Sequence, residues 1–177
     1  MRKIGLFPGT FDPMTLGHLD LIQRSVGLFD ELIIGLVESK TNKKGSSKNI
    51  VLETDFRLEL IASVIKNQGL ENKIKIKVFS GLLINFAKEQ KVNYLIRGLR
   101  SNLDFEYEKL LEGVNKNLAS GLGLNLETIF LMTDARFSHI SSSLVREVAR
   151  LDGDIAGFMP TMPEELFEKL IKNLKEI

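Results

Sequence analysis

The sequence KIGLFPGTFDPMTLGHLDLIQRSV, residues 3–26, joins an apolar segment to an amphipathic one through a short turn. Residues 3–7 are typical of a buried strand, and from Leu19 onward apolar residues recur at helical spacing. Gly9 and Thr10 follow the strand, and a Gly-His pair opens the helix. Backbone amides are free at a helix N-terminus, and the helix dipole there favours anions. The stretch therefore predicts a strand–turn–helix unit that holds a phosphate.

The start of the helix in this unit is expected to lie against the phosphate. Thr15 is expected to cap the helix, which places His18 in the first turn with its imidazole facing the strand end. Gly17 has no side chain to block an anion. The alternative is that Thr15 merely caps the helix and that His18 is a surface or packed histidine. Because Gly9, Thr10, Gly17 and His18 converge on one strand end, we favour the phosphate site.

Strands and helices alternate along the rest of the chain. This pattern predicts βαβ units and a Rossmann-like, doubly wound, five-stranded parallel sheet with helices on both faces. Ligands in such sheets bind beyond the carboxyl ends of the strands. We expect one domain over residues 1–177, with 160–177 as a C-terminal helix. The expected strands are 3–7, 32–37, 74–78 (at a sheet edge), 94–97 and 128–132, and the expected helices begin near 19, 56, 82, 103, 141 and 166, with a loop at 119–125.

Composition excludes several classes of protein. The net charge of +1 argues against a broad polyanion-binding face. The absence of cysteine excludes disulfides and thiol nucleophiles, and two histidines make a zinc hydrolase a poor match. The Gly-x-Gly-x-x-Gly and Walker motifs are absent. No apolar run approaches the roughly 20 residues that span a bilayer, so we expect a cytoplasmic protein.

A second candidate anion site follows the expected fourth strand, at Arg97-Gly98-Leu99-Arg100. An arginine at the end of a buried strand needs a partner, and an anionic ligand held in a bidentate manner would supply one. Gly98 is expected to let the chain turn sharply. The alternative partner for Arg97 is a nearby acid, either Asp104, Glu106 or Glu108.

Two further segments are expected at the same edge of the sheet. Ser141, Ser142 and Ser143 precede an apolar helical pattern, which predicts a second phosphate-binding helix start; simple N-capping is the alternative. The lysine-containing loop 40–48 follows the second strand, where a lysine could close over a substrate phosphate; a solvated loop is the alternative. The acidic stretch 104–108 fits an amphipathic helix with an acidic face.

These motifs together resemble a known family. Gly9 to Pro13 with Gly17-His18 is similar to the T/HxGH signature of the nucleotidyltransferase superfamily, and Ile140 to Ser143 to its second signature. The blocks Asn85–Ala87, Ile96–Arg100 and Asp104–Glu108 resemble bacterial phosphopantetheine adenylyltransferases, with the motifs in order from residue 3 to about 160.

The resemblance implies transfer of AMP from ATP to 4′-phosphopantetheine, giving dephospho-coenzyme A and pyrophosphate by in-line attack without a covalent intermediate. It also implies Mg²⁺, a homohexamer and feedback inhibition by coenzyme A. Nucleic acid, membranes and protein ligands to a metal are not expected. The implied catalytic residues are His18 and Thr10; the implied acceptor-binding residues are Thr10, Lys43, Leu83, Arg97, Tyr107, Leu111 and Asn115; the implied ATP-binding residues are Thr10, Phe11, His18, Gly98, Leu99, Arg100, Glu108, Phe137, Ser138, His139, Ile140, Ser141, Ser142 and Ser143.

The sequence departs from the family pattern at two places: the loop after Lys40 is longer, and residues 119–125 hold a small insertion. Because of the longer loop, either Lys43 or Lys44 could hold the acceptor phosphate, and we choose Lys43. Two alternative functions stay open. A sibling transferase would use nicotinamide mononucleotide or an alcohol phosphate, but it should lack the combined 97–100 and 104–108 blocks. A non-catalytic nucleotide-binding regulator should have lost His18 or Arg100, and both are present.

Overall fold

Five parallel strands form one sheet in a computed structural model, which describes residues 2–38 and 50–176. The strands are β1 (Ile4–Gly9), β2 (Glu31–Val37), β3 (Ile74–Phe79), β4 (Tyr94–Leu99) and β5 (Glu127–Met132). The helices are α1 (Leu16–Ser25), α2 (Thr54–Asn67), α3 (Leu83–Glu89), α4 (Asn102–Gly121), α5 (Ser142–Arg150) and α6 (Glu164–Lys175). Two short 3₁₀ turns, Ala135–Phe137 and Ala156–Phe158, follow β5 and α5.

The strand order is β3-β2-β1-β4-β5, so the chain reverses its direction of winding between β1 and β4. This confirms the predicted doubly wound sheet, and it confirms that residues 74–78 lie in an edge strand. A switch point between two neighbouring strands leaves a crevice at their carboxyl ends. The first predicted phosphate site follows β1, and the arginines lie at the end of β4, so both adjoin this crevice.

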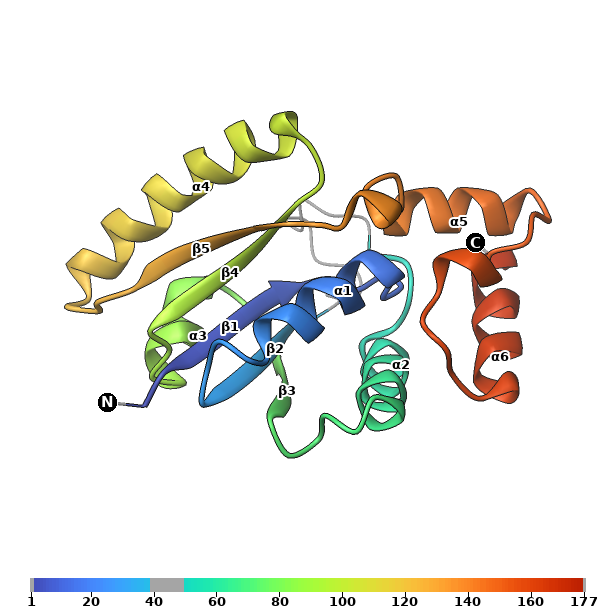
Figure 1. The fold of residues 1–177 in the computed structure, drawn as a ribbon, viewed down its shortest axis with the longest axis horizontal. Helices are drawn as coiled ribbons and strands as arrows, with labels where there is room; N and C mark the ends of the chain where they lie inside the picture. Colours follow the sequence, from blue (N-terminus) through green and yellow to red (C-terminus); the bar gives the residue numbers. More distant parts are fainter. Residues whose placement is uncertain (1, 39–49, 177) are drawn as a thin grey trace.

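Helices cover both faces of the sheet. Apolar residues of α1 and α2 pack with β1 and β2 in one core cluster that includes Ile22, Ile34 and Ile61. On the other face, Leu6 and Leu95 pack against α3 and against Ala119 of α4. Figure 1 shows α5 and α6 together at one end of the molecule and α4 lying along β4 and β5. Within the described ranges, no helix is long and apolar enough to cross a membrane.

The structure corrects two local expectations. Helix α4 continues to Gly121, whereas a loop was expected from residue 119; Ala119 is buried beside Leu126, so packing stabilises the last turn. Gly98 was expected to form a sharp turn, but it lies inside β4, paired with Leu131. A Cβ atom at Gly98 would come within 2.3 Å of the Leu21 side chain, so this glycine permits close packing of α1 on the sheet.

Candidate functional site

A pocket of about 390 Å³ lies at the carboxyl ends of β1 and β4. It is bordered by the start of α1, the end of β4, one turn of α4 and the start of α5. The arrangement brings together most of the predicted ATP-binding and catalytic residues. Those that line the pocket are Thr10, Phe11, His18, Arg97, Gly98, Arg100, Glu108, Ile140, Ser141, Ser142 and Ser143.

Residues 9–18, here called the Thr10 side, include a residue with a strained backbone conformation. Phe11 has a φ of 46°, in the left-handed region that favours glycine. Its ring is 2% exposed and packs edge-on against the His18 imidazole, with ring centres 5.1 Å apart. A Cβ atom on Gly9 would lie 2.9 Å from this ring, so glycine is needed there. Because the Phe11 side chain is in the core, a ligand can contact this residue mainly through its backbone.

The His18 imidazole has a defined protonation pattern. The backbone N–H of Thr15 donates to His18 Nδ1 at 3.0 Å, so Nδ1 is an acceptor and the proton of the neutral ring is on Nε2. Burial, together with the positive charge of Arg100, lowers the pKa of His18 to about 4. His18 is therefore a neutral Nε2–H donor at pH 7. The predicted N-cap at Thr15 and the placement of His18 in the first turn are both confirmed.

Asp12 and two arginines fix the Thr10 side, and sequence reasoning assigned none of them to the site. The buried Asp12 carboxylate accepts from the backbone N–H groups of Val51 and Leu52 at 3.0 and 2.8 Å. Arg146, on α5, donates to the Asp12 carbonyl and carboxylate and lines the pocket. Its spacing one turn after Ser143 could have indicated it.

Arg57, on α2, has no exposed surface and donates to the carbonyl oxygens of Thr10, Val37 and Leu52 at 2.6, 2.9 and 2.9 Å. Burial lowers the pKa of its guanidinium below the usual value, and the charges of Asp12 and Glu53 act in the opposite direction. Nothing in the local sequence distinguishes this arginine from an exposed helical one, because its partners are distant carbonyl groups.

The opposite side of the pocket, here called the arginine side, comprises Arg97 and Arg100 with their partners Asp104 and Glu108. Arg97 donates from Nε and Nη2 to the two Glu108 carboxylate oxygens at 2.6 and 2.7 Å. Arg100 Nε lies 3.2 Å from Asp104 Oδ2. Of the partners considered for Arg97, Glu108 is thus the one it contacts in this structure. Both groups still line the pocket, so an incoming anion can reach them.

The three serines at the start of α5 form internal hydrogen bonds. Ser141 is the N-cap and accepts from the backbone N–H of Leu144 at 3.1 Å, so it caps the helix and also lines the pocket. Ser142 donates to the Pro13 carbonyl at 2.8 Å, and the Ser143 and Ser141 hydroxyls lie 3.0 Å apart. Ser142 therefore also ties α5 to the Thr10 side.

Other predicted site residues lie outside this pocket. Leu99 is buried in β4. Leu83 opens α3, while Tyr107, Leu111 and Asn115 lie on α4 before and after Glu108, with Tyr107 exposed. The loop with the predicted adenine contacts at 137–139 adjoins the pocket, because the Phe137 carbonyl lies 3.6 Å from where a Gly17 Cβ would be. Lys43 and Lys44 fall outside the described residues.

Comparison with known proteins agrees with this geometry. The cytidylyltransferase-like family model matches residues 6–148. A phosphopantetheine adenylyltransferase of Cytophaga hutchinsonii is 41% identical over 160 residues, covering 90% of this chain and 98% of the relative. That of Clostridium perfringens is 38% identical, covering 98% of both chains. The chain belongs to the phosphopantetheine adenylyltransferase family.

Solved structures of two adenylyltransferases have the same fold as this chain. The nicotinic acid mononucleotide adenylyltransferase of Plasmodium falciparum superposes with a TM-score of 0.70 at 17% identity, covering 99% of this chain and 98% of that one. A bifunctional NMN adenylyltransferase/ADP ribose pyrophosphatase of Francisella tularensis gives 0.68 at 14% identity, covering 99% of this chain and 52% of that one. At these identities the likeness confirms the Rossmann-like fold.

Proposed function

We propose that this protein transfers the adenylyl group of ATP to 4′-phosphopantetheine, giving dephospho-coenzyme A and pyrophosphate. The observation that supports this most is the pocket itself, where a neutral histidine donor faces two arginines and a serine-rich helix start. Family membership supports the choice of acceptor, because relatives at about 40% identity over most of the chain bear that name.

The proposed reaction is a single displacement. An oxygen of the acceptor phosphate attacks the α-phosphorus of ATP, a new P–O bond forms, and the bond to the bridging oxygen between the α- and β-phosphates breaks as pyrophosphate leaves. The attacking phosphate is already an anion, so no general base is required. His18 Nε2–H and the Thr10 hydroxyl would stabilise charge that develops on the α-phosphoryl oxygens, and such a donor contributes on the order of 10²–10³ in rate.

The remaining predicted residues divide between the two substrates. Arg97 and a lysine of the 40–48 segment, Lys43 by our choice, would hold the acceptor phosphate. Leu83, Tyr107, Leu111 and Asn115 would contact the pantetheine arm. Gly98 to Arg100, Glu108 and residues 137–143 would contact ATP, and Arg146 joins this set because it lines the same pocket.

Mg²⁺ is proposed to enter with the ATP phosphates. Among the residues that the structure describes, no group of three histidine or acidic side chains could hold a metal ion. Mg²⁺ does not require such a group, because it commonly binds through substrate phosphates and water with one or two carboxylates. When bound, the ion would neutralise phosphate charge; the hydroxyl groups of Thr10 and the serines would orient the same phosphates.

Self-association is proposed along α4. Only Ala119 is buried among its 20 residues. Five of its exposed apolar or aromatic side chains fall at helical spacing on one stripe: Leu103, Tyr107, Leu110, Val114 and Leu118. A stripe of this kind is expected to be covered by another surface. A homohexamer, feedback inhibition by coenzyme A and a cytoplasmic location remain predictions.

Pyrophosphate release tests the proposed activity. Purified protein with ATP and Mg²⁺ should release pyrophosphate when 4′-phosphopantetheine is added. Parallel assays with nicotinamide mononucleotide and with an alcohol phosphate should show no turnover. Turnover with either of these alone would assign the chain to a sibling activity, and absence of turnover with all three would favour the non-catalytic regulator.

A further inference from the structure

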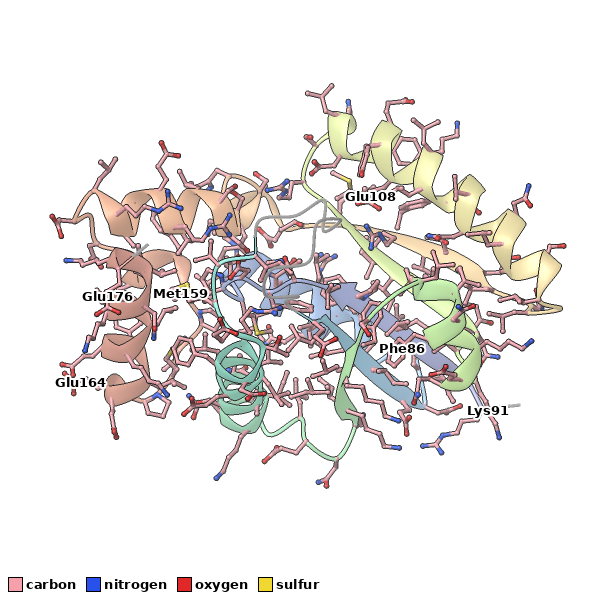
Figure 2. All side chains as sticks on the ribbon, turned by 180° about the vertical axis from the view of Figure 1, so that it is seen from behind. Phe86, Lys91, Glu108, Met159, Glu164 and Glu176 are labelled. Carbon is pink, nitrogen blue, oxygen red and sulfur yellow. The ribbon has the colours of Figure 1, made fainter. Side chains whose placement is uncertain are left out.

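The two arginines at the end of β4 are held by carboxylates from a single face of α4. Asp104 and Glu108 lie one helical turn apart, so their side chains project in nearly the same direction. Figure 2 shows Glu108 on the side of α4 that faces the sheet. The Arg97–Glu108 contact is bidentate, with both carboxylate oxygens within 2.7 Å of guanidinium nitrogens. This is the planar fork geometry in which arginine also binds phosphate.

The Arg97–Glu108 pair is partly open to solvent. The Arg97 side chain is 21% exposed and that of Glu108 15%, and both line the pocket beside Thr10 and His18. The pair is therefore not sealed from the pocket, and a ligand that enters the pocket can reach the guanidinium. A phosphate monoester has a charge of about −1.5 to −2 at pH 7, against −1 for a carboxylate, so it is the stronger ligand for the same guanidinium.

We infer that Glu108 is an internal competitor for Arg97, and that an anionic ligand must displace it to bind. The inference rests on the proposed function only in naming the ligand as the acceptor phosphate. Glu108 then acts as a specificity-determining residue. A neutral alcohol cannot break the pair, whereas a dianionic phosphate can.

The packing of α4 allows a ligand to replace Glu108 at Arg97 without loss of the helix from the sheet. The Phe105 ring packs edge-on against Phe130 of β5, with ring centres 5.6 Å apart. This contact and the buried Ala119 keep the helix on the sheet when the ion pair opens. The neighbouring Arg100–Asp104 pair is longer, at 3.2 and 3.4 Å, and more exposed, so it opposes an anion less.

Calorimetry of ligand binding without ATP tests the inference. The wild-type protein and Glu108→Gln are titrated with 4′-phosphopantetheine and with pantetheine, which lacks the phosphate. Removal of the competing charge should tighten binding of 4′-phosphopantetheine on the order of tenfold, the equivalent of about 1.4 kcal/mol, and leave pantetheine unchanged. Glu106→Gln is the matched control, because Glu106 is exposed on the same helix, loses the same charge and makes no ion pair with a described residue.

Equal or weaker binding of 4′-phosphopantetheine by Glu108→Gln would overturn the inference, as would an equal gain from Glu106→Gln. Failure of the proposed function is seen separately, as an absence of pyrophosphate release by the wild-type protein. In that case inorganic phosphate is the titrant. Tighter binding of inorganic phosphate by Glu108→Gln than by the wild-type protein then supports the inference that Glu108 competes for Arg97, and equal affinities refute it.

Discussion

The Thr10 side of the pocket is fixed by side-chain donors that bind backbone carbonyl groups, whereas the arginine side is held by ion pairs between side chains. The carbonyl groups of Thr10, Asp12 and Pro13 each accept a hydrogen bond, from Arg57, Arg146 and Ser142 respectively. On the other side, Arg97 and Arg100 have only α4 carboxylates as side-chain partners among the described residues. The difference separates two tasks: the Thr10 side keeps a fixed geometry for chemistry, and the arginine side exchanges an internal anion for a ligand.

Arg57→Met should have the largest effect on stability. It leaves the carbonyl groups of Thr10, Val37 and Leu52 without their shared donor, and each polar group left unsatisfied away from water costs about 1–3 kcal/mol, so we expect a loss of about 3–5 kcal/mol. Urea denaturation would measure the loss. Arg57→Lys, which keeps the charge, should recover part of it. A loss below 1 kcal/mol for the methionine variant would show that the Thr10 side is not fixed in this way.

His18→Ala should lower kcat by a factor on the order of 10²–10³, because it removes the Nε2–H donor. Affinity for ATP should change little, since most of the groups around the phosphates remain. Steady-state kinetics and calorimetry would separate the two quantities. If the melting temperature collapsed while the residual folded protein stayed fully active, His18 would have a structural role only.

Arg97→Ala should act on binding more than on chemistry. Loss of a charge-assisted contact of about 1.5–3 kcal/mol should raise KM for the acceptor roughly 10- to 100-fold. The value of kcat should fall much less. The kinetic pattern is thus expected to be opposite to that of His18→Ala. Equal effects of both substitutions on kcat and on KM would contradict the claim that the Thr10 side serves chemistry and the arginine side serves binding.

The pH dependence of stability should reveal the lowered pKa of His18. Its pKa is about 4 in the folded protein and about 6.5 in the unfolded chain, so between these values only the unfolded state binds the proton. The contribution of neutral His18 to the free energy of unfolding is fully present above pH 6.5 and is lost as the pH falls towards 4. Relative to His18→Gln, the wild-type protein should lose about 1–2 kcal/mol more between pH 7 and pH 5. Identical losses for both proteins would place the His18 pKa near its ordinary value.

Ser141→Ala should have the smallest effect, about 1 kcal/mol, because it removes the N-cap of α5. Ser143→Ala is the control, since Leu144 keeps its cap there. Melting temperatures of both variants would measure the effect of the cap, and equal values would show that the Ser141 cap does not stabilise the protein.

The sequence predicts the elements of the fold because strand and helix periodicities are local. Their alternation predicts a doubly wound parallel sheet, and the motif positions indicate the edge of the sheet that holds the site; the order of the strands comes from the structure. Gly98 was misassigned because its role depends on Leu21, a residue 77 positions away that packs against it. Arg57 and Asp12 were missed for the same reason: they bind backbone groups of distant segments, and no short motif records such contacts.

Direct transfer between two bound phosphates is the central claim, and the stereochemical course at the α-phosphorus tests it most directly. ATP with a chiral thiophosphate at the α-position is converted with 4′-phosphopantetheine, and the configuration of the product is determined. A single in-line displacement on the Thr10 side gives inversion. Retention would require two displacements through a covalent intermediate and would contradict the mechanism.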